Sequence, residues 1–467
     1  MPTRSETRHL PWRHRPFAEV LRLAWPIAVS LLSFSTMTAV DTLFIGHLGP
    51  SALAGVAIGS TATFTLLCFG MGLLRSTHIT ISQAVGAGHK QRVLAYLGAG
   101  LIVAVGLGLV IAIVGQVVAA FTASFTASDA SAQYAATYMR VRVLGAPLVL
   151  AEHALSGARY GAGDSRSSMI AVLTANAVNV ILVALFSLVW NAGVAGVASA
   201  TVLSQVVEVY VLIRRQRPQG FGLSNWRPAD IRMLVRTGVP LGIERFFDVS
   251  AFGLMILLMA RMGDNELAAH QVAHQALLFG FMPIMAIGDA ATVLMGQAAG
   301  AGSLRTVLRV QRAQLAAGLC YALLCCIAYS AIGPYFAEQF TQDTQVIARA
   351  VQLLQIAAVF VWIWPLYSTG QSTLRAIGDV KAASLITVIA AWGCTPLFAA
   401  WLGIGLGLGA RGGYIGLAIE ITLGSLAFWW RIHRGGAWMR NLRRFRSELR
   451  KGNNSPERVS SEVAVSV

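Results

Sequence analysis

The chain has 467 residues, of which 56% are hydrophobic and only 12% are charged. Soluble globular proteins keep about a quarter of their residues charged, so this composition excludes an ordinary soluble protein and indicates a membrane protein. The formal net charge of +16 lies in short gaps between apolar runs, as charges that set membrane topology do. We therefore expect a lipid bilayer around the chain, and no nucleic acid as a partner.

Apolar runs of membrane-spanning length follow one another along the sequence. A basic tail at 1–17 precedes six runs that form a first half at 18–213, namely 18–45, 52–85, 94–120, 131–156, 165–190 and 194–213. An arginine-rich linker at 214–230 leads to six more in a second half at 231–430, before a charged tail at 431–467: these are 231–261, 266–298, 308–333, 346–373, 381–404 and 412–430. Because about twenty apolar residues span a bilayer as a helix, the sequence predicts an all-α integral membrane protein with twelve transmembrane helices, six in an N-lobe and six in a C-lobe.

The positions of the basic residues test this topology. Of the 36 Lys and Arg residues, 28 lie in the two tails and the even-numbered gaps, whereas three lie in the odd-numbered gaps and their margins. Loops rich in Lys and Arg stay on the cytoplasmic side of a membrane. We therefore expect both termini in the cytoplasm and the chain in the cell (inner) membrane.

The two halves also repeat each other. Pro26 recurs as Pro240, and the motif that begins at Gln83 recurs at Gln297, both after 214 residues. Six spans per repeat is an even number, so the two lobes share one orientation and are related by a pseudo-two-fold axis along the membrane normal. Transporters built from such halves bind substrate between them and give access to each side of the membrane in turn.

A lone carboxylate, Asp41, interrupts the first apolar run. Ionisable residues within a membrane span are costly, and they usually face a cavity and handle ions or protons. Asn179 in the fifth run and Thr201 in the sixth supply an amide and a hydroxyl for the same kind of site. The alternatives are an interfacial Asp41 bonded to its own helix, and polar side chains that only join neighbouring helices.

In the seventh run Glu244 and Asp248 are four residues apart and share one helix face. Two acids on one face inside a membrane repel each other when both are charged, which suits a carrier of protons or cations. They form a possible ion or substrate site of the second lobe. The alternative is that they pair with Arg245 or with another helix.

Arg75 in the second run and Asp289 in the eighth are 214 residues apart, so they occupy equivalent places in the two halves. If these helices face each other across the central cleft, the two side chains form a salt bridge that closes it in one state. Each residue alternatively pairs within its own half.

Three further residues are candidates for lining a substrate cavity. Trp362 and Tyr367 in the tenth run can bind flat organic cations through cation–π contacts. Met255 in the seventh run belongs to a group of methionines that can form an adaptable apolar surface. Packing and aromatic belts at the membrane interface explain such residues equally well.

A membrane-embedded hydrolase or transferase is an alternative from another class. It needs a nucleophile with a base, or a metal cluster, on facing helices. The five cysteines lie within apolar runs without the spacing of a metal site, and His270 and His274 lack an apparent third ligand. We expect no enzyme activity, no bound metal and no cofactor other than a coupling ion.

Together these motifs resemble the multidrug and toxic compound extrusion (MATE) family. The resemblance covers about residues 18–431, and the segment YMRVRVLGAP resembles its DinF-like branch; the motifs, in chain order, are WP…VDTLFIGHLGPSALAGVAIG, SQAVGAG, YMRVRVLGAP, LSGARYGAGD, LAAHQVAHQ and MGQAAGAG. It implies a monomeric antiporter that exports cationic or amphipathic small molecules from the cytoplasm in exchange for H⁺ or Na⁺. A flippase or exporter of a lipid-linked or polar precursor, from the same superfamily, is the alternative.

The resemblance also assigns roles to single residues. Asp41 matches the acid that binds the coupling ion, and Asn179 and Thr201 match its polar partners. Val183 stands where many members have a second acid, which favours H⁺ over Na⁺. Asp248 resembles an acid of the NorM-like branch, but its usual acidic partner has no match, because 346–373 contains no Asp or Glu.

Overall fold

The computed structural model describes residues 10–121 and 128–434, and these residues form helices joined by short turns. The predicted tails therefore lie partly outside the described residues, at 1–9 and 435–467. The N-terminal half contains η1 (Pro11–His14), α1 (Pro16–Gly46), α2 (Pro50–Gly86), α3 (Lys90–Phe121), α4 (Asp129–Leu144), α5 (Ala146–Gly161), α6 (Ser165–Ala184), η3 (Leu185–Val189), α7 (Gly193–Gln216) and η4 (Arg217–Gln219). The C-terminal half contains α8 (Pro228–Met262), α9 (Asp264–Gly300), α10 (Leu304–Ala331), α11 (Gly333–Glu338), α12 (Thr344–Phe360), α13 (Trp364–Ala376), α14 (Val380–Phe398), η5 (Ala399–Gly405) and α15 (Ala410–Arg434).

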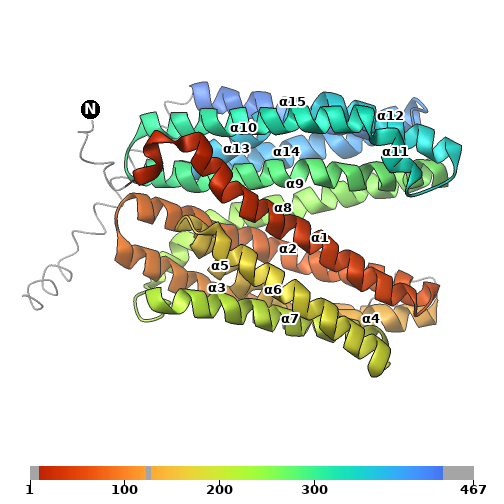
Figure 1. Ribbon diagram of the computed structural model, residues 1–467, viewed down its shortest axis with the longest axis horizontal. Coiled ribbons are helices and arrows are strands. Elements are labelled where there is room, and N and C mark those ends of the chain that lie inside the picture. Colours follow the sequence, from red (N-terminus) through yellow and green to blue (C-terminus); the bar gives the residue numbers. More distant parts are fainter. Residues whose placement is uncertain (1–9, 122–127, 435–467) are drawn as a thin grey trace, which may run out of the picture.

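Nine of the described helices are long and apolar enough to span a membrane, and the bent pair α12–α13 makes a tenth. The other two predicted spans are α8 and the pair α4–α5, which are less apolar because they carry several charged side chains. The helices run side by side along the molecule in two layers (Figure 1). The predicted fold class, twelve helices in two lobes, is confirmed.

Two of the predicted runs are broken in the structure. The run 131–156 forms α4 and α5, which meet at Gly145, with Pro147 in the first turn of α5. The run 346–373 forms α12 and α13, with a bend of 51° between them and Pro365 in the first turn of α13. A proline has no N–H to donate to the preceding turn, so the ladder of helical hydrogen bonds is interrupted there and a new helix starts.

The linker is shorter than predicted. α7 continues to Gln216, and α8 already begins at Pro228, so the connection is 217–227 and not 214–230. The Asp230 side chain accepts a bond from the Arg227 N–H and caps α8.

α1 and α8 belong to both lobes. The first half of α1 places Val20, Leu23 and Ile27 in the core of the C-terminal half, whereas Ile45 near its other end packs in the N-terminal half. In Figure 1 α1 crosses diagonally from one layer to the other. α8 crosses in the opposite sense, because Met233 near its start packs in the N-terminal half and Met255 further along packs in the C-terminal half.

Small residues bring the crossing helices close to their partners. A Cβ atom on Gly238 or Gly242 of α8 would lie 2.3 and 2.7 Å from the carbonyl oxygens of Leu73 and Phe69 on α2. Close approach through small residues is how membrane helices gain packing contacts without a hydrophobic drive. The equivalent positions of α1 are Ala24 and Ala28, so both crossings are built from the same pattern.

Candidate functional site

The structure brings Asp41, Asn179 and Thr201 together from three helices. The Thr201 hydroxyl lies 3.2 Å from Asp41 Oδ2, and the Asn179 amide nitrogen lies 3.5 Å from that hydroxyl. The three residues expose 8% or less of their surfaces. They sit on α1, α6 and α7 near the ends remote from the basic turns 86–90, 161–165, 216–228, 300–304 and 376–380, which we call the basic end.

Two oxygens at this site have no hydrogen-bond partner. Asp41 Oδ1 and Asn179 Oδ1 are buried without a partner within the described structure. Buried polar atoms are normally paired, so two unpaired acceptors beside one hydroxyl suit a small cation or a proton. Arg142 on α4 is close enough for its charge to act on Asp41, but the pair is not an ion pair.

Val183, where the resemblance led us to look for a second acid, lies in an apolar cluster. Val183, one turn after Asn179, is fully buried and belongs to an apolar cluster with Ile45 and Phe186. The Val183 side chain therefore supplies no oxygen ligand at this position.

Arg75 and Asp289 form an ion pair between α2 and α9. The alternative that each pairs within its own half is therefore wrong. Two residues that are equivalent under a two-fold rotation and also touch each other must lie next to the rotation axis. Their side chains keep 32% and 21% of their surfaces accessible, so the pair sits at the centre of the molecule in contact with solvent.

From this pair to the basic end, α2 and α9 are in close contact. A Cβ atom on Gly86 would lie 1.8 Å from the Gln297 carbonyl oxygen, and one on Gly300 would lie 2.0 Å from that of Gln83. The Gln83 amide donates to the Ala376 carbonyl (2.8 Å) and the Gln297 amide to the Gly161 carbonyl (3.1 Å), each in the other lobe. These reciprocal bonds close the molecule at its basic end.

The turn that carries the Gly161 carbonyl is itself fixed. Asp164 caps α6 by accepting bonds from the Ser167 N–H and hydroxyl, and it pairs with Arg159. Partial burial would raise the pKa of Asp164, but these hydrogen bonds and the Arg159 charge together hold it below its usual range. The carboxylate therefore stays charged and keeps the turn in place.

The first described residues contact the same glutamine. Trp12 in η1 donates from its indole nitrogen to the side-chain oxygen of Gln297, at 3.0 Å. Trp226 is equivalent to Trp12 in the repeat. One of them lies before the first helix and the other lies in the connection between the two halves.

Glu244 and Asp248 do not act as a pair. Glu244 forms an ion pair with Arg375 and accepts a bond from Ser384 (2.6 Å), and both members of the ion pair are buried. Asp248 lies 3.6 Å from Arg245 and keeps 47% of its side-chain surface accessible. Both residues therefore adopt the pairing that was the alternative to an ion site.

Two of the predicted cavity residues lie in the core. Met255 exposes 1% of its surface and packs within the apolar core of the second lobe. Tyr367 exposes 5% and lies stacked on Trp364 and edge-on to Phe428. Trp362, in the break between α12 and α13, is 37% exposed. Met255 and Tyr367 therefore do not line an open cavity in this conformation.

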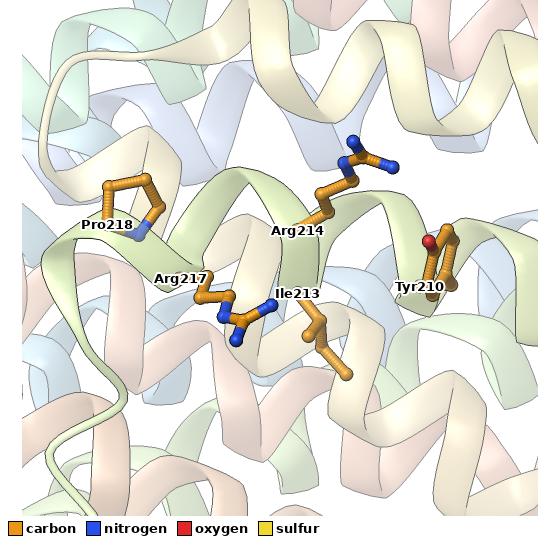
Figure 2. Close-up of a pocket in the computed structure, with 5 residues that line it drawn as sticks. All are labelled: Tyr210, Ile213, Arg214, Arg217 and Pro218. Atoms are coloured by element: carbon orange, nitrogen blue, oxygen red, sulfur yellow. The ribbon is translucent and has the colours of Figure 1, made fainter.

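A surface depression lies at the basic end of α7, away from the axis. Figure 2 shows its lining residues along the last turns of this one helix and the start of the linker: Tyr210, Ile213, Arg214, Arg217 and Pro218. Its mixture of arginines with exposed apolar side chains is typical of the interface between membrane and water. It is not the candidate transport site.

Sequence reasoning missed one buried carboxylate, Glu420 on α15. Among the described residues four carboxylates are buried, namely Asp41, Glu244, Asp379 and Glu420. Glu244 and Asp379 form ion pairs with Arg375 and Arg431, whereas Asp41 and Glu420 form none within the described residues. A lone acid in the apolar run 412–430 is the same signal that singled out Asp41.

The MatE family model matches the chain twice, over residues 26–185 and 240–401. The two matches begin 214 residues apart, which is the offset of the internal repeat, and together they cover more than half of the chain. The chain belongs to the MATE family. This is a family of multi-pass membrane transporters and not of enzymes.

Several relatives are similar over most of their length. A probable multidrug resistance protein NorM from Deinococcus radiodurans is 29% identical over 87% of this chain and 93% of its own. The multidrug resistance protein MdtK of Edwardsiella ictaluri is 28% identical over 82% and 86%. A MOP superfamily transporter from Pyrococcus furiosus shares the fold with a TM-score of 0.85, 22% identity, and coverage of 94% of this chain and all of the other.

A cleft lined by several arginines would favour the alternative substrate, a lipid-linked anionic precursor. Arg75 is paired with Asp289, Arg140 is exposed, and Arg142 lies beside the Asp41 site. The described structure offers no cluster of unpaired arginines at the centre of the molecule.

Proposed function

We propose that this MATE transporter is a secondary antiporter that exports cationic or amphipathic drugs from the cytoplasm in exchange for H⁺, and less readily for Na⁺. The observation that carries the proposal is the buried Asp41, held by a hydroxyl and with an unpaired oxygen, without an ion-pair partner in the described residues. Relatives named as multidrug resistance proteins support the class of substrate.

The oxygens at the site favour a proton over a sodium ion. Asp41 supplies the one formal negative charge, and Val183 supplies no oxygen where a second acid would stand. A proton needs only Asp41 itself, whereas a desolvated cation needs several oxygens arranged around it. Protonation also gives Asp41 an O–H that can donate, which changes its bond with Thr201.

The path from this site to the lobes runs through α1. Its far half carries Asp41 in the N-lobe, and its near half packs in the core of the C-lobe. A change in the bonds of Asp41 therefore acts on a helix that joins both lobes. Binding can shift an equilibrium between two packings only by binding them unequally, and the protonation state of Asp41 provides such a difference.

In this proposal the basic end faces the cytoplasm and the membrane is the cell's inner membrane, with both termini inside. The Arg75–Asp289 pair and the reciprocal Gln83 and Gln297 bonds then close the cytoplasmic side. They have to separate when the transporter opens inward to load its substrate. We propose that one chain does this alone, as a monomer.

Transport in liposomes tests the proposal. Efflux of a fluorescent organic cation is driven by a pH gradient or by a Na⁺ gradient in turn, for the native protein, Asp41→Asn, and the control Asp129→Asn, whose carboxylate is exposed at the start of α4. We expect the pH gradient alone to drive efflux, Asp41→Asn to abolish it, and the control to keep it. Efflux driven only by Na⁺ would overturn proton coupling, and no transport of any cation would overturn the substrate class.

A further inference from the structure

Glu420 is a buried acid that the proposed mechanism does not use. It exposes 8% of its surface, as much as Asp41. One oxygen, Oε2, accepts a hydrogen bond from the Thr395 hydroxyl on α14. Glu420 forms no ion pair within the described residues, whereas eight other carboxylates there each pair with a basic side chain. A buried, unpaired carboxylate is costly unless a cation or a proton neutralises it.

The surroundings of Glu420 are shaped around it. Gly416 and Gly424 lie one turn before and one turn after it on the same face of α15. A Cβ atom on Gly416 would lie 3.2 Å from the Thr395 carbonyl oxygen, and one on Gly424 would lie 2.5 Å from the Tyr367 ring. The two glycines thus let α14 and α13 close over the carboxylate.

Thr395 is used differently from its neighbours. Thr387 on α14 and Thr422 on α15 donate their hydroxyls to carbonyls four residues back in their own helices. Thr395 donates to Glu420 instead. It is followed by Pro396, and α14 then continues as the wider turn η5. Irregular helix turns of this kind recur at functional sites.

Thr395 and Glu420 lie on the two helices of the second lobe that correspond to two helices of the Asp41 site. Asn179 and Thr201 lie on α6 and α7, and Thr395 and Glu420 lie on α14 and α15, their counterparts in the second lobe. Both carboxylates are in the half of the molecule remote from the basic end. The true equivalent of Asp41 is Met255, which lies in the apolar core, so the second lobe has its acid on a different helix.

We propose that Glu420 and Thr395 form a second monovalent-cation site, in the C-lobe, which binds a proton or Na⁺. The inference rests on the proposed antiport, because the site would take the same class of coupling cation as Asp41. The titratable groups on adjoining helices whose charges interact with that of Glu420 are Asp248 on α8, Tyr367 on α13 and Cys394 on α14. None of them carries a positive charge.

Measurements on purified full-length protein in the Asp41→Asn background test the second site alone. One arm follows the rise in melting temperature that Na⁺ causes relative to choline. The other follows the infrared carbonyl band of a protonated carboxylic acid on acidification. We expect one of these two signals in Asp41→Asn and its loss in Asp41→Asn/Glu420→Gln. Signals that are identical in the two proteins would overturn the proposal.

A second variant guards against misfolding of Glu420→Gln. Thr395→Val keeps the acid but removes its hydroxyl partner, and Thr422→Val is the matched control, since its hydroxyl bonds only within α15. We expect Thr395→Val to weaken the cation response and Thr422→Val to leave it unchanged. An equal response in both would count against the site. Because Asp41 is absent from both measured proteins, failure here is separate from failure of the antiport assay.

Discussion

Arg75 and Asp289 occupy equivalent places in the two halves of the repeat, and the structure shows that they form an ion pair. Its position next to the pseudo-two-fold axis means that it has to break whenever the lobes separate at the basic end. The two side chains are equivalent, so exchanging them leaves the geometry of the pair nearly unchanged. This makes the pair testable by a charge swap.

We expect Arg75→Asp and Asp289→Arg each to impair transport strongly, because each places two like charges beside the axis. The double variant restores the attraction and should recover part of the rate, measured as drug efflux from the same liposomes. Absence of any rescue would mean that the pair has no part in closure. The exposed acid Asp129, changed to Arg, serves as the control for an added charge.

The buried network around Glu244 leads to a prediction about stability. Removing one partner of a buried ion pair leaves a buried charge and costs about 3–5 kcal/mol, whereas an accessible pair is worth about 1 kcal/mol or less. Glu244→Gln should therefore lower the melting temperature of the purified protein far more than Asp248→Asn. Equal losses would show that Arg375 finds another partner.

The sequence predicted several of the site residues but not the side chains that they contact. Asp41, Asn179 and Thr201 come together as expected. The partner of Glu244 is Arg375, 131 residues further along, and nothing in the local pattern of either segment indicates this contact. Met255 and Tyr367 were assigned to a cavity by residue type, but burial depends on which face of the helix meets the core.

Among the elements, α2 and α9 determine how tightly the basic end closes. Their contact depends on glycines at equivalent positions, since any side chain at Gly86 or Gly300 would meet the backbone of the facing helix. Backbone atoms cannot move aside as a flexible side chain can. The two helices therefore form a seam that tolerates no added atom.

Gly86→Ala should push α2 away from α9 and disfavour the closed basic end. We expect a longer distance between spin labels placed on the turns 87–89 and 301–303. Gly106→Ala, on α3, is the control, because no atom lies within 4 Å of a Cβ atom there. An unchanged distance distribution for Gly86→Ala would show that the seam does not hold the basic end closed.

Helix positions followed from apolar runs, but helix breaks did not. The runs 131–156 and 346–373 read as continuous, because composition alone does not distinguish a span from two short helices that meet at an angle. Gly145 lies at the first of these breaks and Pro365 lies just after the second. The predicted linker begins at 214, although α7 continues to Gln216. Arginines in the last turns of a helix extend into the interface, so their sequence resembles that of a loop.

Over the whole molecule, the repeat predicted the architecture best. A constant offset fixed two lobes, a common orientation and the axis, and the same offset recurs in the small residues of the two lobe crossings. The repeat did not predict that the equivalent residues Gln83 and Gln297 make different numbers of hydrogen bonds. Gln297 receives a bond from Trp12 in addition to the one it donates to Gly161, whereas within the described residues the Gln83 side chain bonds only to the Ala376 carbonyl.

We therefore expect Gln297→Ala to destabilise the closed molecule more than Gln83→Ala. One additional hydrogen bond contributes about 0.5–1.5 kcal/mol, which should appear as a larger drop in melting temperature. In a Trp12→Phe background the two glutamine variants should become equal, because only the shared bond remains in each. A difference that persists there would mean that Trp12 does not cause the asymmetry.

The placement of the two equivalent tryptophans has a consequence for how the molecule opens. Phe221 before Trp226 and Met233 after it pack against the core of the N-terminal half. Trp12 packs against the core of the C-terminal half, as the first half of α1 does. Each tryptophan therefore belongs to the half that the helix following it leaves, since α1 ends in the N-terminal half and α8 ends in the C-terminal half. When the basic end opens, Trp12 and its partner Gln297 would move together with the C-terminal half, and Trp226 would move with the other half.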